Sequence, residues 1–257
     1  MKRKFVFFDI DGTLTDRSNN EVVPSAREAL KKLQENGHLV AIATGRAYYK
    51  AKALMEDLGI TEMVCYGGGG IVIDSKLLYM KPLNRENVLK IYDEACEKGY
   101  GTGFLLEDSI NLYSSNNLFV EQTGGRKEPT KMVIDPSFDP HQLRDIYKIY
   151  VACPIAKEKD FQTRDLVGHI RFEKEYLTYQ YDAKDQGVIE MVEYYKGDIS
   201  DVIVFGDDEN DEVMFRKEWT SIAMGNATER LKAKADFVTK RNVDDGIEYA
   251  LKTFGLI

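Results

Sequence analysis

Short apolar or largely apolar runs, accompanied by helical patterns, recur at both ends of this chain. The runs are Phe5–Phe8 and Leu39–Ala43 near the N-terminus, and Val202–Phe205 and Ser221–Met224 near the C-terminus. Apolar residues at helical spacing accompany them: Ala26, Ala29, Leu30 and Leu33; Val188, Met191, Val192 and Tyr195; Ile247, Ala250, Leu251 and Phe254. Strands that are apolar on both faces suit a parallel sheet covered by helices. The order of these elements predicts an α/β fold with a Rossmann-like parallel-sheet core.

The middle of the chain has a different pattern. Several runs there are β-rich or alternate between apolar and polar residues: Gly103–Leu106, Ile110–Tyr113, Lys131–Ile134, Ile149–Ala152, His169–Phe172 and Leu177–Tyr181. Helical stretches lie between some of them, and strands bunched with helices in this way are typical of a separate α+β unit. We therefore expect a core made of residues 1–82 and 183–257, with an inserted domain at residues 83–182.

Composition narrows the classes of partner. The chain has 35 Lys and Arg against 43 Asp and Glu, a net charge of −8. That balance argues against a nucleic-acid or anionic-membrane surface, although it allows a small anionic substrate. The three cysteines form no CxxC pair, which predicts reduced thiols. The first apolar run stops after four residues, too short for a signal peptide, and no run is long enough for a membrane helix. These features predict a cytoplasmic protein.

Two acidic motifs directly follow predicted strands. Asp9 and Asp11 come after Phe5–Phe8, and the run Gly206–Asp211 comes after Val202–Phe205. In open α/β sheets, ligands bind at the carboxyl ends of the strands. Acids grouped there suit a hard, oxygen-ligated cation such as Mg²⁺. Taken singly, each motif could also be a polar turn or a loose acidic loop.

Two further motifs suit anion binding. Thr44-Gly45-Arg46 follows Leu39–Ala43 and opens a predicted helix that ends near Leu58, so Thr44 is expected to be its N-cap. Lys184 lies between the Leu177–Tyr181 run and the next helix. On their own, the tripeptide could be simple capping and the lysine a solvated surface residue. All four motifs belong to strand ends that a parallel sheet gathers on one edge.

Together these motifs resemble those of the haloacid dehalogenase (HAD) superfamily, and more narrowly its Cof-type phosphatases. Those enzymes carry a large α/β cap between the second and third motifs, which corresponds here to residues 83–182. The resemblance implies that Asp9 is the nucleophile and Asp11 the acid/base, with a backbone carbonyl at Asp11 facing the metal. It also implies that Asp207 is a Mg²⁺ ligand and that Asp211 supports the metal site.

The same resemblance implies four phosphate-binding positions: Thr44, Gly45, Lys184 and Asn210. The family often has Asn-Gly just before the cap, whereas this chain has Gly67 at the place of the asparagine. Within the cap, charged residues that could contact a substrate are Glu107, Arg126 and Arg171.

The implied function is a Mg²⁺-dependent phosphatase for small-molecule phosphate monoesters that works through an aspartyl-phosphate. Sugar phosphates, pyridoxal phosphate and flavin-precursor phosphates all fit. Asp11 disfavours a dehalogenase, because a halide leaves without a proton. Two alternatives stay open: a phosphomutase of the same architecture, and a non-catalytic protein that binds phosphorylated ligands. The sequence leaves the oligomeric state open.

Overall fold

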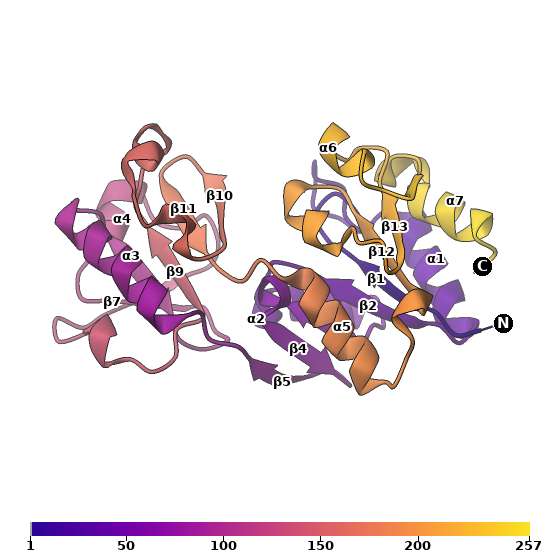
Figure 1. Ribbon diagram of the computed structural model, residues 1–257, viewed down its shortest axis with the longest axis horizontal. Helices are drawn as coiled ribbons and strands as arrows, with labels where there is room; N and C mark the ends of the chain where they lie inside the picture. The colour runs from indigo at the N-terminus through magenta and orange to yellow at the C-terminus, as the bar shows by residue number, and fades with distance from the viewer. Residues whose placement is uncertain (1) are drawn as a thin grey trace. The chain divides into compact units, whose positions relative to one another are not determined.

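The computed structural model describes residues 2–257, apart from the side chain of Phe172. The chain forms two compact units. The first, which we call the core unit, contains the chain up to Tyr79 and Ala183–Ile257. The second, the inserted unit, contains Met80–Asp182. Figure 1 shows the elements of both. That the inserted unit acts as a cap stays a prediction.

The core unit is built on an eight-stranded sheet in the order β14-β13-β12-β1-β2-β3-β4-β5. β1 lies at its centre and pairs in parallel with β12 and β2, and the pairs β2–β3, β12–β13 and β13–β14 are also parallel. The strands are β1 (Phe5–Phe8), β2 (Leu39–Ala43), β3 (Glu62–Cys65), β4 (Gly70–Ile73), β5 (Lys76–Met80), β12 (Val202–Gly206), β13 (Thr220–Ala223) and β14 (Phe237–Val238). This arrangement confirms the expected α/β core.

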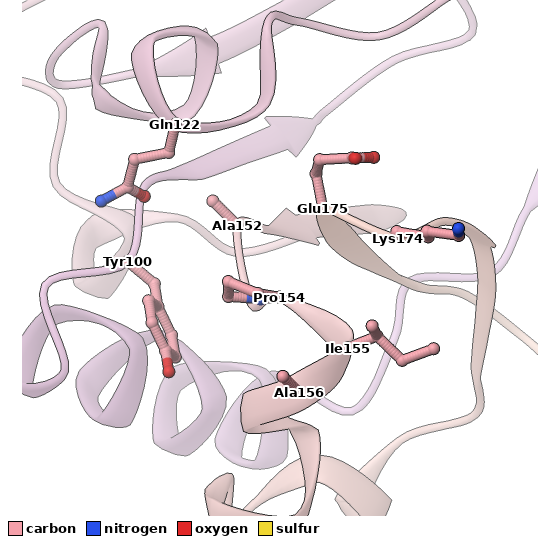
Figure 2. Close-up of a pocket in the computed structure, with 8 residues that line it drawn as sticks. All are labelled: Tyr100, Gln122, Ala152, Pro154, Ile155, Ala156, Lys174 and Glu175. Carbon is pink, nitrogen blue, oxygen red and sulfur yellow. The ribbon is translucent and has the colours of Figure 1, made fainter.

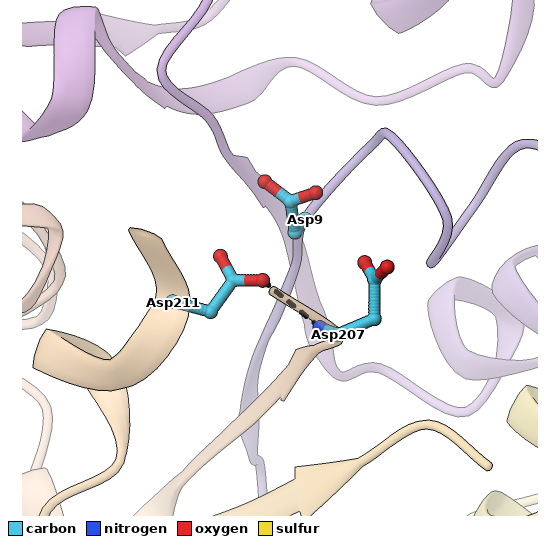
Figure 3. Close-up of side chains that lie close together, drawn as sticks. All are labelled: Asp9, Asp207 and Asp211. Carbon is cyan, nitrogen blue, oxygen red and sulfur yellow. Dashed lines mark hydrogen bonds between the residues drawn. The ribbon is translucent and has the colours of Figure 1, made fainter. Parts of the chain in front are cut away.

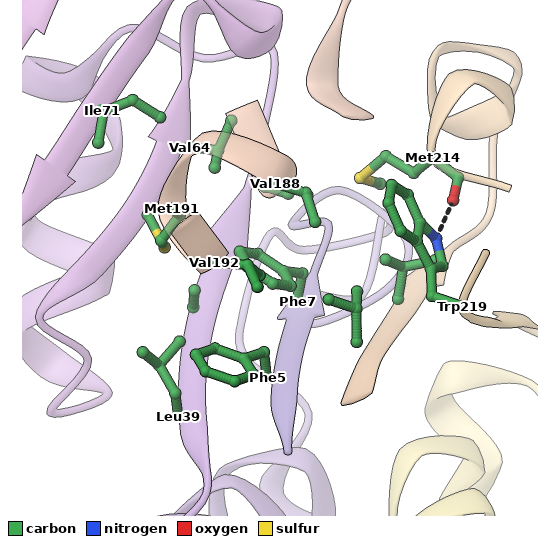
Figure 4. Packing of buried hydrophobic residues seen from close by; sticks show 14 of the residues in the cluster. Phe5, Phe7, Leu39, Val64, Ile71, Val188, Met191, Val192, Met214 and Trp219 are labelled. Carbon is green, nitrogen blue, oxygen red and sulfur yellow. Dashed lines mark hydrogen bonds between the residues drawn. The ribbon is translucent and has the colours of Figure 1, made fainter. Parts of the chain in front are cut away.

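The helices of the core unit cover the sheet because they are apolar on one side. They are α1 (Pro24–Glu35), α2 (Tyr48–Asp57), α5 (Lys184–Tyr194), α6 (Glu229–Lys232) and α7 (Gly246–Thr253). Short 3-10 helices join them: η1 (Tyr66–Gly68), η5 (Ile199–Asp201), η6 (Glu209–Met214) and η7 (Asn242–Asp244). Val188, Met191 and Val192 of α5 pack in one cluster with Phe5 and Phe7 of β1 (Figure 4). Burial of such side chains is the main favourable term in folding.

Two details of this unit differ from the expectation. The sheet is not wholly parallel, because β4 runs antiparallel to β3. The glycine run makes the turn between these strands, with Gly67 and Gly68 at positive φ of 64° and 103°. The prediction that Thr44 caps the next helix is wrong. α2 begins at Tyr48 after the N-cap Ala47, and the Thr44 Oγ1 accepts a hydrogen bond from the Arg46 N–H at 3.1 Å.

The inserted unit has a six-stranded sheet in the order β10-β11-β9-β6-β7-β8, and it is antiparallel except for β7–β8. Its strands are β6 (Thr102–Leu105), β7 (Asn111–Ser114), β8 (Lys131–Ile134), β9 (Lys148–Val151), β10 (His169–Glu173) and β11 (Tyr176–Tyr179). Its helical segments are α3 (Arg85–Glu97), α4 (Leu118–Thr123), η2 (Pro140–Gln142), η3 (Ile155–Asp160) and η4 (Arg164–Leu166).

Alternate residues of β9 pack into two different hydrophobic clusters. Ile149 and Val151 pack in one cluster with α3, whereas Tyr150 packs in another with Phe119 of α4. A period of two is what a strand between two apolar layers requires.

The inserted unit also holds an open cavity of about 450 Å³. Tyr100, Pro154 and Ile155 contribute apolar walls, and Lys174 and Glu175 line it as well (Figure 2). The cavity belongs to the inserted unit alone and contains none of the motif residues. Across residues 2–257, no helix is both long enough and apolar enough to span a bilayer.

Candidate active site

Three buried carboxylates meet at the carboxyl ends of the central strands. Asp9 follows β1, Asp207 follows β12, and Asp211 lies in η6. Each offers an oxygen that lies within 4.8 Å of the others. The exposed fractions of these residues are 5%, 3% and 0%. Figure 3 shows the three side chains around a common space. Among the described residues this is the one group of three or more potential metal ligands that lie this close together.

Lys184 places a cation against two of these carboxylates. Its Nζ lies 2.8 Å from the Asp9 Oδ1 and 2.6 Å from the Asp211 Oδ1, and its side chain is 1% exposed. The glycine turn brings it there: the Gly67 carbonyl accepts from the Ala183 N–H at 2.8 Å, just before α5 begins. A Cβ on Gly68 would lie 2.0 Å from the Ala183 carbonyl oxygen. The run of glycines thus lets η1 approach the start of α5 and position Lys184.

Asp211 is held rigidly by backbone donors. Its Oδ2 accepts from the N–H groups of Asp207 at 2.9 Å and Asp208 at 3.1 Å. The bond from the Asp208 N–H is one half of a capping box at the start of η6, and in the other half the Asp208 side chain accepts from the Asp211 N–H. Because the Asp211 carboxylate also accepts from Lys184, its buried charge is fully satisfied.

Crowding of negative charge shows in the pKa values. Burial, together with the charge of Asp211, raises the pKa of Asp9 to about 8. The same two causes raise the pKa of Asp207 to about 7. Burial alone would lower the pKa of Lys184, but Asp211 and Asp9 outweigh it and hold that pKa above its ordinary value. The site therefore has an excess of negative charge that a cation would relieve.

Asp11 lies outside this trio and pairs with Arg46. The Arg46 Nε donates to the Asp11 Oδ2 at 3.0 Å, and its Nη2 donates to the Asp11 Oδ1. The Asp11 side chain is about half exposed, unlike the three buried carboxylates. Arg46 was part of the second motif, but the sequence analysis assigned no role to it.

Sequence reasoning also missed Arg17 and Asn226. The Arg17 Nη2 lies 2.8 Å from the Asp207 Oδ2, and its Nε donates to the Asp11 carbonyl at 3.2 Å. The Asn226 Nδ2 donates to the Gly12 carbonyl at 2.8 Å. Arg17 follows the first motif by six residues, and no spacing rule marks it. Asn226 lies two residues after the predicted strand Ser221–Met224, and this place at a strand end was the available signal.

The remaining predicted residues lie at the same sheet edge. Thr44 is buried at the end of β2, and its N–H donates to the Val64 carbonyl at 2.9 Å. Gly45 follows it and is half-buried. Asn210 is half-buried in η6, directly before Asp211.

The charged residues considered as cap contacts bond within the inserted unit. The Glu107 carboxylate accepts from Asn111 at 2.7 Å, Arg171 pairs with Glu158 at 2.7 Å, and Arg126 lies over the ring of Tyr150 at 4.5 Å.

The donor set fits a divalent cation. Carboxylate oxygens of Asp9 and Asp207 and the carbonyl oxygen of Asp11 are the hard ligands that Mg²⁺ prefers. In the structure, the guanidinium of Arg17 bonds to two of these three groups, so they already attract a positive charge.

Comparisons with known proteins agree with the fold. A family model of haloacid dehalogenase-like hydrolases matches residues 6–251. The putative phosphatase YkrA of Bacillus subtilis is 33% identical, over 100% of both chains. The 5-amino-6-(5-phospho-D-ribitylamino)uracil phosphatase YwtE of the same bacterium is 27% identical, over 96% of both. A hypothetical protein from Geobacillus kaustophilus superposes with a TM-score of 0.81 at 32% identity, over 100% of both chains. The chain thus belongs to the haloacid dehalogenase-like hydrolase family, and it is a phosphatase of that family.

Proposed function

We propose that this phosphatase is Mg²⁺-dependent and hydrolyses small-molecule phosphate monoesters through an aspartyl-phosphate on Asp9. The observation that carries the proposal is the convergence of Asp9, Asp207 and Asp211 around Lys184 at one sheet edge. A carboxylate next to a cation site can attack an anionic phosphate, because the cation offsets the repulsion between the two negative charges.

The metal would be held by the carboxylates of Asp9 and Asp207 and by the Asp11 carbonyl. Asp211 would support the site through its bonds to the Asp207 N–H and Lys184. When bound, Mg²⁺ would supply positive charge that offsets the repulsion between these carboxylates and a phosphate.

A carboxylate oxygen of Asp9 would attack the phosphorus. A new P–O bond to Asp9 forms as the bond from phosphorus to the ester oxygen breaks. The equatorial phosphoryl oxygens need donors, because charge spreads over them in the transition state. The Lys184 ammonium has three N–H donors, of which Asp9 and Asp211 use two. We assign the third to a phosphoryl oxygen, with the Thr44 hydroxyl, the Gly45 N–H and the Asn210 amide as further donors.

Asp11 would move the protons. As a carboxylic acid it protonates the leaving alkoxide, and as a carboxylate it then takes a proton from the water that attacks the aspartyl-phosphate. The second step breaks the P–O bond to Asp9, releases inorganic phosphate and restores the Asp9 carboxylate. Such acid/base help is typically worth about 10²–10⁴ in rate. Arg46 would orient Asp11 for both transfers.

Pre-steady-state kinetics with p-nitrophenyl phosphate test these roles separately. The p-nitrophenolate group leaves without a proton, so Asp11→Asn should still phosphorylate Asp9 but hydrolyse the intermediate slowly. We expect a burst approaching one p-nitrophenol per active site, followed by turnover that is about 10²–10⁴-fold slower than wild type. Asp9→Asn should give neither burst nor turnover.

Controls separate the chemistry from the fold. EDTA should abolish the wild-type reaction, and added Mg²⁺ should restore it. Arg27→Ala removes an exposed ion pair with Asp57, remote from these motifs, and should keep the wild-type rate. Wild-type turnover by Asp9→Asn would exclude the covalent mechanism. A requirement for a bisphosphate activator would instead favour the phosphomutase.

The substrate class can be approached with a panel of metabolite phosphates. We propose that the inserted unit acts as the cap and selects among them. The panel should include sugar phosphates, pyridoxal phosphate and the flavin precursor named for the relative YwtE. Phosphate release, with Mg²⁺ and with EDTA, ranks them. Binding of several phosphate esters without turnover of any would favour a non-catalytic binding protein.

A further inference from the structure

We infer that Arg17 is an internal counter-cation that occupies part of the divalent-metal site in the metal-free protein and is displaced when the metal binds. This inference rests on the proposed function, because it assumes that the carboxylates take up Mg²⁺. It adds a residue outside the catalytic set, with a role in setting how tightly the metal binds.

The contacts of Arg17 point to this exchange. Its Nη2 donates to the Asp207 Oδ2 at 2.8 Å and to the Asp208 Oδ2 at 2.8 Å. Its Nε donates to the Asp11 carbonyl oxygen at 3.2 Å. The Asp207 carboxylate and the Asp11 carbonyl are two of the three groups that we assign to the metal. One guanidinium therefore joins ligands from β1 and β12 that an ion would otherwise join.

The space that Arg17 uses is kept open by the backbone. Gly12 has a φ of +91°, and a Cβ there would lie 2.2 Å from the Asp207 Oδ2 and 2.4 Å from the Arg17 Nε. Asn226 donates to the Gly12 carbonyl and accepts from the Asn242 N–H at 2.9 Å, which fixes this turn. A side chain at position 12 would separate the guanidinium from the carboxylate.

Charge explains why Arg17 is bound without metal and why it would give way. Three buried carboxylates and the Lys184 ammonium leave two formal negative charges when all are ionised. Arg17 supplies a single charge spread over a guanidinium, whereas Mg²⁺ supplies two on a compact ion that prefers oxygen ligands. The ion therefore offsets the excess more fully, and the two cations compete for the same oxygens.

Displacement of Arg17 requires little rearrangement. Its side chain is 53% exposed, so the guanidinium can return to water at small desolvation cost. Asp208 is 41% exposed and can remain its partner after the bonds to Asp207 and Asp11 are lost. Arg17 would thus stay bound to Asp208 when it leaves Asp207 and the Asp11 carbonyl.

Isothermal titration calorimetry of Mg²⁺ into the metal-free protein tests the competition. If Arg17 competes with the ion, Arg17→Ala should bind Mg²⁺ about fivefold more tightly, which corresponds to about 1 kcal/mol and is usual for an exposed ion pair. Arg27→Ala loses an arginine whose side chain is 41% exposed and pairs with Asp57 instead of the site carboxylates, and it should bind Mg²⁺ as the wild type does. Equal or weaker binding by Arg17→Ala would overturn the inference.

A second measurement follows Arg17 itself in the wild-type protein. The Nε–H resonance of Arg17 can be assigned by its loss in Arg17→Lys. Addition of Mg²⁺ should shift this resonance and speed its exchange with water, because the bond to the Asp11 carbonyl breaks. A resonance that stays unchanged at saturating Mg²⁺ would mean that Arg17 keeps its place, and the inference would be wrong.

The outcomes separate this inference from the proposed function. If the wild type binds no Mg²⁺ at all, both fail. If Mg²⁺ binds with unaltered affinity in Arg17→Ala, and only the affinity for inorganic phosphate falls, Arg17 is a phosphate ligand rather than a counter-cation. In that case the metal-dependent mechanism stands and the exchange does not.

Discussion

The ion pair between Lys184 and Asp211 should be among the most costly interactions to break in the core unit. Replacing Asp211 with Asn keeps the shape of the side chain but removes its charge. An Asn oxygen can still accept from the Asp207 and Asp208 N–H groups. Its amide then faces the Lys184 ammonium, so a donor meets a donor where the carboxylate had accepted at 2.6 Å.

The expected cost follows from that distance and from burial. At an effective dielectric constant of about 20, two unit charges 2.6 Å apart attract by about 6 kcal/mol, most of which desolvation cancels. Removing one partner of a buried ion pair typically costs about 3–5 kcal/mol, because the other charge stays buried. Lys184 keeps its bond to Asp9 at 2.8 Å, so we expect Asp211→Asn to lower the free energy of unfolding by about 3 kcal/mol, at the low end of that range.

Urea denaturation followed by tryptophan fluorescence measures this loss of stability in the core unit, which contains Asp211. Trp219 is the single tryptophan, it is buried in the core cluster, and its Nε1–H donates to the Met214 carbonyl at 2.7 Å. Met214 ends η6, the turn that carries Asp211. The experiment is done with EDTA, so that no metal ion replaces the lost interaction. Because the charge of Asp211 raises the pKa of Asp9 and of Asp207, Asp211→Asn also relieves repulsion among these carboxylates.

A double-mutant cycle supplies the decisive comparison. Lys184→Met combined with Asp211→Asn removes both charges, so the double variant should be at least about 2 kcal/mol more stable than the sum of the single effects implies. Asp57→Asn breaks the exposed pair with Arg27 and should cost less than about 1 kcal/mol. Strict additivity of Lys184→Met and Asp211→Asn, or an unchanged urea midpoint for Asp211→Asn, would refute the reasoning.

Two further predictions concern contacts with backbone groups. The Glu94 carboxylate accepts from the N–H groups of Gln162 and Thr163, both at 2.7 Å; these bonds outweigh burial and hold its pKa below the ordinary 4.5. That stabilisation is present above pH 4.5 and is lost as the pH falls through the lowered pKa. Glu94→Gln should thus cost about 1–3 kcal/mol at pH 7 but less at pH 3, by hydrogen exchange of the inserted unit. Gly68→Ala should cost at least about 2 kcal/mol, because its φ is +103° and its Cβ would meet the Ala183 carbonyl; an unchanged urea midpoint would contradict this.

The sequence predicted the core well where each strand is buried on both faces. Leu39–Ala43 was expected as a strand and is one over the same residues, because continuous apolar runs have few other uses. The strands β4 and β5 were not expected. β5 is largely exposed at the sheet edge and lacks the apolar signal, and β4 follows a glycine turn without a break in composition.

The positions of the candidate site residues could be predicted from the sequence, but the hydrogen-bond partners of their side chains could not. Residues at strand ends could be placed on one edge because parallel strands share a direction. The pairing of Asp11 with Arg46, and of Arg17 with Asp207, depends on how loops fold back over that edge. Those bonds join residues 35 and 190 positions apart, and no local periodicity encodes them.

The fold offsets the charge of its three buried carboxylates with groups from separate backbone segments. Lys184 comes from the start of α5, the N–H donors to Asp211 come from η6, and Arg17 comes from the loop after β1. Each of these groups supplies one positive charge or less, and each lies on a different backbone segment. Together they offset part of the repulsion among the carboxylates, and the charge that remains is what the proposed Mg²⁺ would offset.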